Sequence, residues 1–165
     1  LASSMGRLFD AAAAVLGLRT RVAYEAQAAM ELEALAGRRA APALPFPVLE
    51  DRSGGWLLDP LPLLTALGER RRAGASPADL AAAFHSSVAV AATEVADRAC
   101  QAADTEVVVL CGGVFQNARL LEAVSQRLEV RLLQVLTPRR LGPNDGAISY
   151  GQAAIGAARL AAETG

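Results

Sequence analysis

The chain has 165 residues, a formal net charge of −1 and 53% hydrophobic residues. That length suffices for one domain with a buried core, and the near-neutral charge argues against nucleic-acid binding, which usually requires a basic surface. All 16 lysine or arginine positions are arginine, so chemistry through a lysine nucleophile or Schiff base is excluded. No apolar run approaches the ~20 residues of a membrane-spanning helix, so we expect no membrane partner.

The two cysteines, Cys100 and Cys111, are too few for a disulfide framework and predict a reducing cytoplasm. No signal-peptide pattern precedes the first predicted helix. Leu1 stands where a methionine would begin a complete protein, so we expect a fragment cut from a longer chain.

A first helix is predicted from Ser3 or Ser4, either of which can cap it, to about Leu16, where Gly17 ends it. Its inner face is predicted to carry four apolar residues: Leu8, Ala12, Val15 and Leu16.

A second helix is predicted from about Tyr24 to Ala36, with Gly37 as its end. The residues predicted to pack from it are Met30, Leu32 and Leu35. Glu25 and Gln27 lie in its first turn, where they either cap the helix and favour its dipole or contact a ligand. Spacing alone leaves both interpretations open.

A β-hairpin is predicted next, with strands at 48–51 and 56–58 around a glycine turn at 53–55. Asp59 and Pro60 then begin a third helix that ends in the solvated arginines at 70–72. Its predicted packing residues are Leu61, Leu63, Leu64 and Leu67. Ser76 and Pro77 begin a long helix from about Ala78 to Ala102.

The only histidine, His85, lies in that long helix beside Phe84. One histidine cannot form a metal site, and no cysteine or carboxylate lies three or four positions away from it. The sequence therefore predicts a structural role for His85.

The centre of the chain is a strand at 107–110, followed by Gly112, Gly113 and a helix from Asn117 to about Leu128. Three β-branched residues in the strand predict burial on both faces. A strand, two glycines and a helix form an arrangement that binds phosphate, because the backbone can approach the anion and offer free N–H groups. A plain tight turn is the alternative. The helix is predicted to bury Leu120, Leu121, Val124 and Leu128.

A second buried strand is predicted at 132–136, a loop follows to Pro143, and Asn144 or Asp145 caps a last helix from Gly146 to about Ala162. The order strand, helix, strand, helix predicts a right-handed parallel crossover. Both loops then open at the carboxyl ends of neighbouring strands, where α/β proteins bind ligands. The sequence therefore predicts that the two loops share one crevice.

Four segments stand out, in this order: SSMGRLFD at 3–10, YEAQAAMELE at 24–33, GGVFQNARLL at 112–121 and PNDG at 143–146. Together they resemble the hydrogenase-maturation carbamoyltransferases (HypF) and, more distantly, the tRNA threonylcarbamoyladenosine transferases. The resemblance runs from Ser3 to about Gln152. It implies a helix-rich α/β fold, the carboxyl-terminal part of an actin/hexokinase-like (ASKHA) domain with a β-hairpin and a parallel strand–helix–strand–helix unit. We expect residues 1–165 to form this single domain.

The resemblance also implies ligand roles, although it names no catalytic residue. Gly112, Gly113 and Asn117 would hold ATP or ADP, and Asp10 its ribose hydroxyls. Asp145 would ligate a divalent metal, iron or zinc in the full-length domain, together with two histidines of a His-x-x-x-His motif that is absent from this sequence. A lone carboxylate should hold such an ion only weakly.

Two positions depart from the family pattern. The family usually has glycine where this chain has Ala26, which puts a very close approach of ligand to backbone there in doubt. It more often has serine at Cys111, and its acceptor thiol belongs to a partner protein. Cys111 beside the glycines could act as a nucleophile; we predict instead a small buried packing residue.

The activity implied by the resemblance is carbamoyl transfer. In the family a YrdC-like domain makes carbamoyl-adenylate from ATP and carbamoyl phosphate, and the transferase domain passes the carbamoyl group to the carboxyl-terminal cysteine of HypE during nickel–iron hydrogenase maturation. We expect the YrdC-like domain and the other transferase half upstream on the same polypeptide, and a homodimer of the chain alone. Alternatives are an O-carbamoyltransferase acting on a small hydroxylated metabolite, an inactive nucleotide-binding fragment, and a non-catalytic scaffold.

Overall fold

The computed structural model describes residues 4–52 and 54–164. Its longer helices are α1 (Met5–Val15), α2 (Gln27–Ala36), α3 (Pro60–Arg72), α4 (Pro77–Ala103), α5 (Ala118–Val130) and α6 (Ile148–Thr164). Its strands are β1 (Val48–Glu50), β2 (Trp56–Leu58), β3 (Val107–Val109) and β4 (Gln134–Leu136). Two short 3₁₀ helices are η1 (Gly113–Gln116) and η2 (Asp145–Ala147). The predicted order of elements is confirmed.

Helix ends follow the local signals in the sequence. The Ser4 hydroxyl accepts the Arg7 N–H at 3.4 Å and caps α1, whereas the alternative cap, Ser3, lies outside the described residues, as does Ser53 of the predicted hairpin turn. Asp59 caps α3 by accepting the Leu61 N–H at 3.0 Å.

Helix α2 begins three residues later than predicted. Ala26 has φ 61° and ψ 6°, the left-handed conformation, which cannot continue a right-handed helix. The first helical residue is therefore Gln27 rather than Tyr24. Gly37 at φ 53° ends the helix as predicted.

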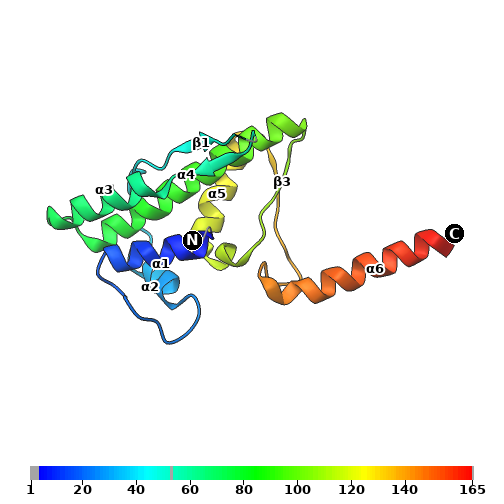
Figure 1. The fold of residues 1–165 in the computed structure, drawn as a ribbon, viewed down its shortest axis with the longest axis horizontal. Helices are drawn as coiled ribbons and strands as arrows, with labels where there is room; N and C mark the ends of the chain where they lie inside the picture. Colours follow the sequence, from blue (N-terminus) through cyan, green and yellow to red (C-terminus); the bar gives the residue numbers. More distant parts are fainter. Residues whose placement is uncertain (1–3, 53, 165) are drawn as a thin grey trace.

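The core is helical and centres on α4, which contacts α1, α2, α3 and α5 (Figure 1). Its largest fully buried apolar side chains are Phe9, Leu16, Leu32, Leu63, Leu67, Phe84, Val88, Leu120, Val124 and Leu128. Three residues predicted to pack here are instead exposed, namely Val15, Met30 and Leu61. Periodicity identified the helices, but the neighbouring helices decide which part of each apolar stripe is covered. On α1 that part includes Phe9 and Ala13.

The sheet structure consists of two pairs. Strands β1 and β2 form the predicted antiparallel hairpin, and β3 pairs with β4 in parallel, with Val107 opposite Gln134 and Val109 opposite Leu136. The prediction that the second pair is buried on both faces is wrong, because Val109 is 59% exposed and Leu136 44%. Both strands alternate exposed, half-buried, exposed, so only one face of each is covered.

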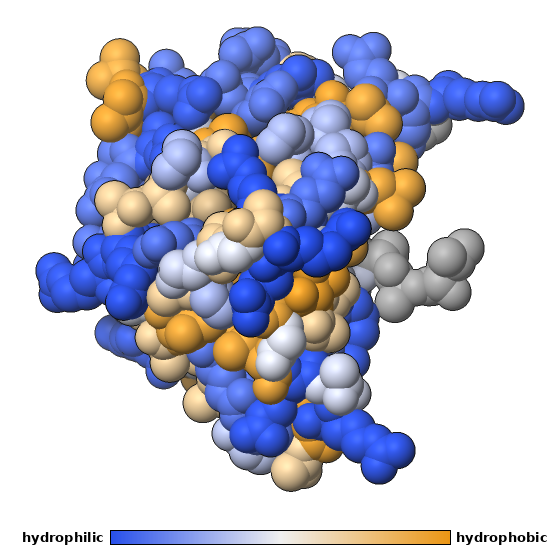
Figure 2. Space-filling model, turned by 90° about the vertical axis from the view of Figure 1, so that its left-hand side faces the viewer, coloured by the Kyte–Doolittle hydropathy of each residue, from blue (hydrophilic) through white to orange (hydrophobic). Residues whose placement is uncertain are grey.

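Helix α6 extends away from the packed helices toward the carboxyl terminus (Figure 1). Its apolar side chains are exposed, including Ile148, Ile155 and Leu160. At the opposite end of the molecule, apolar residues form only separate patches among polar ones (Figure 2). In the described part of the chain, no helix combines the length and apolar character required to cross a membrane.

Candidate functional site

The first loop of the candidate site leaves the carboxyl end of β3. Leu110 is buried, Cys111 is exposed, and Gly112 has φ 101° and ψ 154°. An L side chain rarely adopts that φ, so the turn itself requires glycine at 112. Gly113, which begins η1, has no positive φ.

The loop ends at α5, which Asn117 caps. Its side-chain Oδ1 accepts the Leu120 N–H at 2.8 Å, and the residue is buried. Leu120, Val124 and Leu128 then face the core as predicted. The helix start that the sequence placed at Asn117 is confirmed.

A second loop, after β4, meets the first. The Gly112 N–H donates to the Pro143 carbonyl oxygen at 2.6 Å. A hollow of about 480 Å³ lies between the loops, lined by Cys111 and Gly112 on one side and by Pro143 to Asp145 and neighbouring residues on the other. The prediction that both loops open into one crevice is confirmed.

Asp145 is not the helix cap that the sequence suggested. It is the first residue of η2, Asn144 precedes it, and neither side chain makes a capping hydrogen bond. The Asp145 carboxylate is exposed in the hollow, and within the described residues it has no hydrogen-bond or ion-pair partner. Local capping therefore does not account for a carboxylate at this position.

A metal site is not complete in the described ranges. They contain no group of three histidine, cysteine, aspartate or glutamate side chains that could hold an ion. The chemistry of the Asp145 carboxylate suits a divalent cation, but one ligand is not a site.

The prediction that Cys111 is buried is wrong. We expected a buried packing residue, yet its side chain is exposed and lines the hollow. Successive residues of an extended chain point to opposite sides, so the burial of Leu110 turns Cys111 outward. The buried cysteine is Cys100, on α4.

Asp10 lies on α1, outside the residues that line the hollow. Its carboxylate pairs with the Arg7 guanidinium at 2.9 Å and is 30% exposed. Helix α1 contacts η1, so Asp10 and the loop from Gly112 to Gln116 (the glycine loop) belong to neighbouring elements. Its role toward ribose stays a prediction.

Side-chain hydrogen bonds stabilise the start of α2. The buried Gln27 accepts the Ala23 N–H at 2.8 Å and donates to Glu31 at 3.0 Å. Arg19 donates to both oxygens of Glu31, and these hydrogen bonds hold the pKa of the Glu31 carboxyl below its usual range. Gln27 thus has a structural role, whereas Glu25 is exposed just before the helix.

His85 is buried, which confirms its predicted structural role. Its Nδ1 lies 2.8 Å from the Ala81 carbonyl oxygen, and its Nε2 lies 3.0 Å from Asn117 Nδ2. Burial lowers the pKa of His85 to about 4; the Ala81 carbonyl opposes this effect and the Arg119 charge adds to it. The neutral ring therefore donates through Nδ1 and accepts from Asn117 through Nε2. Sequence reasoning missed this contact between residues far apart in the chain.

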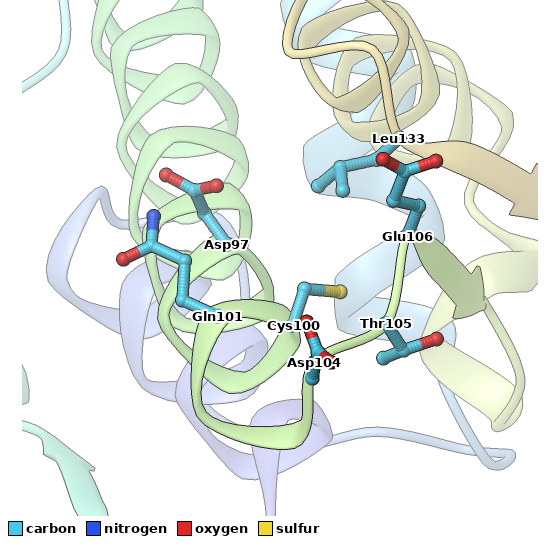
Figure 3. Close-up of a pocket in the computed structure, with 7 residues that line it drawn as sticks. All are labelled: Asp97, Cys100, Gln101, Asp104, Thr105, Glu106 and Leu133. Atoms are coloured by element: carbon cyan, nitrogen blue, oxygen red, sulfur yellow. The ribbon is translucent and has the colours of Figure 1, made fainter.

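A second hollow, of about 350 Å³, lies at the opposite ends of β3 and β4, where the strands begin (Figure 3). Asp97, Asp104 and Glu106 make it acidic, and Asp97 pairs with Arg131 at 3.4 Å. Ligands of α/β folds bind outside the carboxyl ends of the strands. The hollow at Gly112 and Asp145 is therefore the better candidate.

The chain is similar to known proteins along most of its length. The family model described as "Carbamoyltransferase, Kae1-like Domain, second subdomain" matches residues 1–152. Carbamoyltransferase HypF of Rhodobacter capsulatus is 43% identical over 161 residues, which cover 97% of this chain and 20% of that protein. Carbamoyltransferase HypF2 of Cupriavidus necator is 41% identical, over 92% of this chain and 21% of that protein. A probable bifunctional tRNA threonylcarbamoyladenosine biosynthesis protein of Methanocorpusculum labreanum is 32% identical over 53% of this chain.

Two solved structures share the fold. The crystal structure of full-length HypF in the phosphate- and nucleotide-bound form matches with a TM-score of 0.87 and 35% identity, over 95% of this chain and 20% of that one. T. kodakarensis HypF matches with a TM-score of 0.78 and 26% identity, over 96% of this chain and 20% of that one. The predicted helix-rich α/β fold is confirmed. The chain spans about a fifth of the length of these relatives.

Proposed function

This chain belongs to the family of HypF carbamoyltransferases, and on that premise we propose that its hollow between Gly112 and Asp145 binds the phosphate groups of an adenine nucleotide during carbamoyl transfer. ATP or ADP is the expected ligand. Gly112, Gly113 and Asn117 form the segment that receives it, and Asp10 on the neighbouring helix is assigned to the ribose.

This proposal rests mainly on the open space around Gly113. Its φ is not positive, and a Cβ added there would meet no heavy atom within 4 Å. The fold therefore does not require glycine at this position, whereas a ligand that approaches the backbone would. Within residues 4–52 and 54–164, the N–H groups of Gly113 and Val114 also have no hydrogen-bond acceptor. Free, neighbouring N–H groups are suited to bind phosphate oxygens.

The transfer that such a site serves is an acyl transfer. A thiolate of the acceptor attacks the carbonyl carbon of carbamoyl-adenylate, the bond from that carbon to the phosphate oxygen breaks, and AMP leaves with the electron pair. Backbone N–H groups that bind the phosphate stabilise this leaving group. We assign the acceptor role to the carboxyl-terminal cysteine of a HypE-like protein in hydrogenase maturation, and the setting to the cytoplasm.

Asp145 is the ligand that this chain offers to a divalent iron or zinc ion. Such an ion supplies Lewis-acid polarisation of a carbonyl or phosphoryl oxygen. Its other ligands must come from outside the described residues, since these hold no cluster of three ligating side chains. We therefore expect the chain alone to bind nucleotide without completing the transfer.

Titration calorimetry with ADP tests the nucleotide site. The parent chain is expected to bind, and Gly113→Val to weaken binding at least about tenfold, because the branched side chain occupies the space of the phosphate. Gly156→Val, on α6, is the matched control, since a Cβ there also meets nothing within 4 Å. Equal affinities of Gly113→Val and the parent would contradict the assignment.

The exposed apolar side chains of β3, β4 and α6 predict that the chain associates with itself. Val109, Leu136 and Leu160 are between 44% and 65% exposed, and exposed apolar surface favours association. In longer relatives the remainder of the transferase half would cover these faces. The chain alone should therefore form a homodimer in sedimentation velocity, and a monomer at high concentration would contradict this expectation.

A further inference from the structure

We propose that His85 is a positioning residue that fixes the side chain of Asn117, and with it the loop from Gly112 to Gln116, in the orientation that the nucleotide site needs. This inference rests on the proposed function only in the measurement of ADP binding. The other measurements test the contacts of the buried His85 ring.

The two ends of the Asn117 amide have different partners. Oδ1 accepts the Leu120 N–H at 2.8 Å, and Nδ2 lies 3.0 Å from His85 Nε2. An amide turned by 180° would place its NH₂ group against the Leu120 N–H and its oxygen against the Nε2 lone pair. Both contacts would then be repulsive. The lone pair of His85 therefore selects the amide orientation that caps α5.

The His85 ring can present that lone pair because its tautomer is fixed. Nδ1 lies 2.8 Å from the Ala81 carbonyl oxygen, which can only accept, so the proton resides on Nδ1. The ring plane is fixed as well, by edge-on contacts with Phe9 at 5.4 Å and Phe84 at 5.8 Å between ring centroids.

The same ring joins two elements of the proposed site. Phe9 precedes Asp10 on α1, and Asn117 ends the loop that begins at Gly112. Phe9 and His85 are both 1% exposed, and Asn117 is 9% exposed. A ring that only filled space in the core would touch the same neighbours without selecting the Asn117 orientation. Packing and positioning therefore predict different results when the ring nitrogens are removed.

Three variants separate the two roles. His85→Phe keeps an aromatic ring and removes both hydrogen bonds. His85→Gln restores a carbonyl oxygen that can accept from Asn117 Nδ2, although its packing is poorer. Val88→Ala is the control for packing alone, because Val88 is buried on the same helix and makes no side-chain hydrogen bond.

Nuclear magnetic resonance of the Asn117 side-chain amide gives one readout that packing alone does not move. Hydrogen exchange at Phe115 and Leu120, whose N–H groups donate to the Gly112 carbonyl oxygen and to Asn117 Oδ1, gives another. We expect His85→Phe to shift the amide signals, to speed exchange about tenfold and to weaken ADP binding about tenfold, the size expected for one lost hydrogen bond. His85→Gln should recover most of each effect, and Val88→Ala should leave exchange at the loop unchanged.

The inference is overturned if His85→Phe leaves the Asn117 amide and the loop exchange as in the parent, or if His85→Gln is as impaired as His85→Phe. If the parent binds no ADP, the nucleotide proposal fails while the amide and exchange measurements still decide the role of His85. If His85→Phe does not fold, the nitrogen spectrum of the parent ring decides: protonation at Nε2 would contradict the assignment, and protonation at Nδ1 supports it.

Discussion

Similar apolar side chains are buried among the helices around α4 but exposed on the β3–β4 unit and on α6. Leu32, Leu63 and Leu67 are 0% exposed among the packed helices, whereas Leu136 is 44% and Leu160 65% exposed. The glycine loop and Asn117 lie where η1 and α5 contact the packed helices, and Asp145 lies in the less buried region. One half of the proposed site therefore lies on fully packed helices, whereas the other half lies on less buried elements. Packed and weakly packed regions open with different free energies.

The largest expected difference comes from the same substitution in the two regions. Leu32→Ala removes a fully buried side chain, so we expect the free energy of unfolding to fall by about 2–5 kcal/mol. Leu160→Ala removes one that is 65% exposed, and the change should stay within about 0.5 kcal/mol. Urea unfolding of both variants measures these values. Equal losses would show that α6 packs as firmly as α2.

Acid should weaken the packed region through His85. The folded pKa is lowered from 6.5 to about 4 by burial. The neutral ring therefore contributes its full stability above pH 6.5, and this contribution declines as the pH falls toward 4. We expect a loss of about 3 kcal/mol between pH 7 and pH 4. Urea midpoints of the parent and His85→Phe across this range test the prediction, because their carboxylates are the same. Parallel profiles would mean that His85 does not titrate on unfolding.

A smaller effect is expected at the N-cap of α2, where a non-glycine residue has a positive φ. Ala26 has φ 61°, so Ala26→Gly should raise the free energy of unfolding by about 1 kcal/mol. Ala34→Gly, on the exposed side of the same helix, should lower it by about 1 kcal/mol. Thermal unfolding of the two variants measures both changes in stability. A decrease for both would mean that the left-handed conformation is not strained.

Sequence signals that act over a few residues predicted much of this fold. Asp59 with Pro60, Ser4, Gly37 and Asn117 marked helix ends correctly, because caps and glycine stops depend on neighbouring residues. The crossover rule also predicted that the two loops would meet, since it depends only on the order of elements.

Predictions that depend on contacts between residues distant in the sequence were less successful. Val109 and Cys111 were expected to be buried and are exposed, because burial depends on what covers a strand and not on its apolar composition. Asp145 resembled a cap in sequence but begins a 3₁₀ helix. The bond from Asn117 to His85 joins residues 32 positions apart, so no local pattern could reveal it.

We propose that the glycine loop and the Asp145 loop form one site for nucleotide phosphate, at the carboxyl ends of β3 and β4. Titration of the ¹⁵N-labelled chain with ADP, followed by backbone amide shifts, is the decisive experiment. We predict that Gly113, Val114 and Asp145 shift together along one binding curve, while Asp104 and Glu106, in the hollow at the other end of the strands, stay unchanged. Shifts confined to Asp104 and Glu106, or no shifts at saturating ADP, would contradict the account.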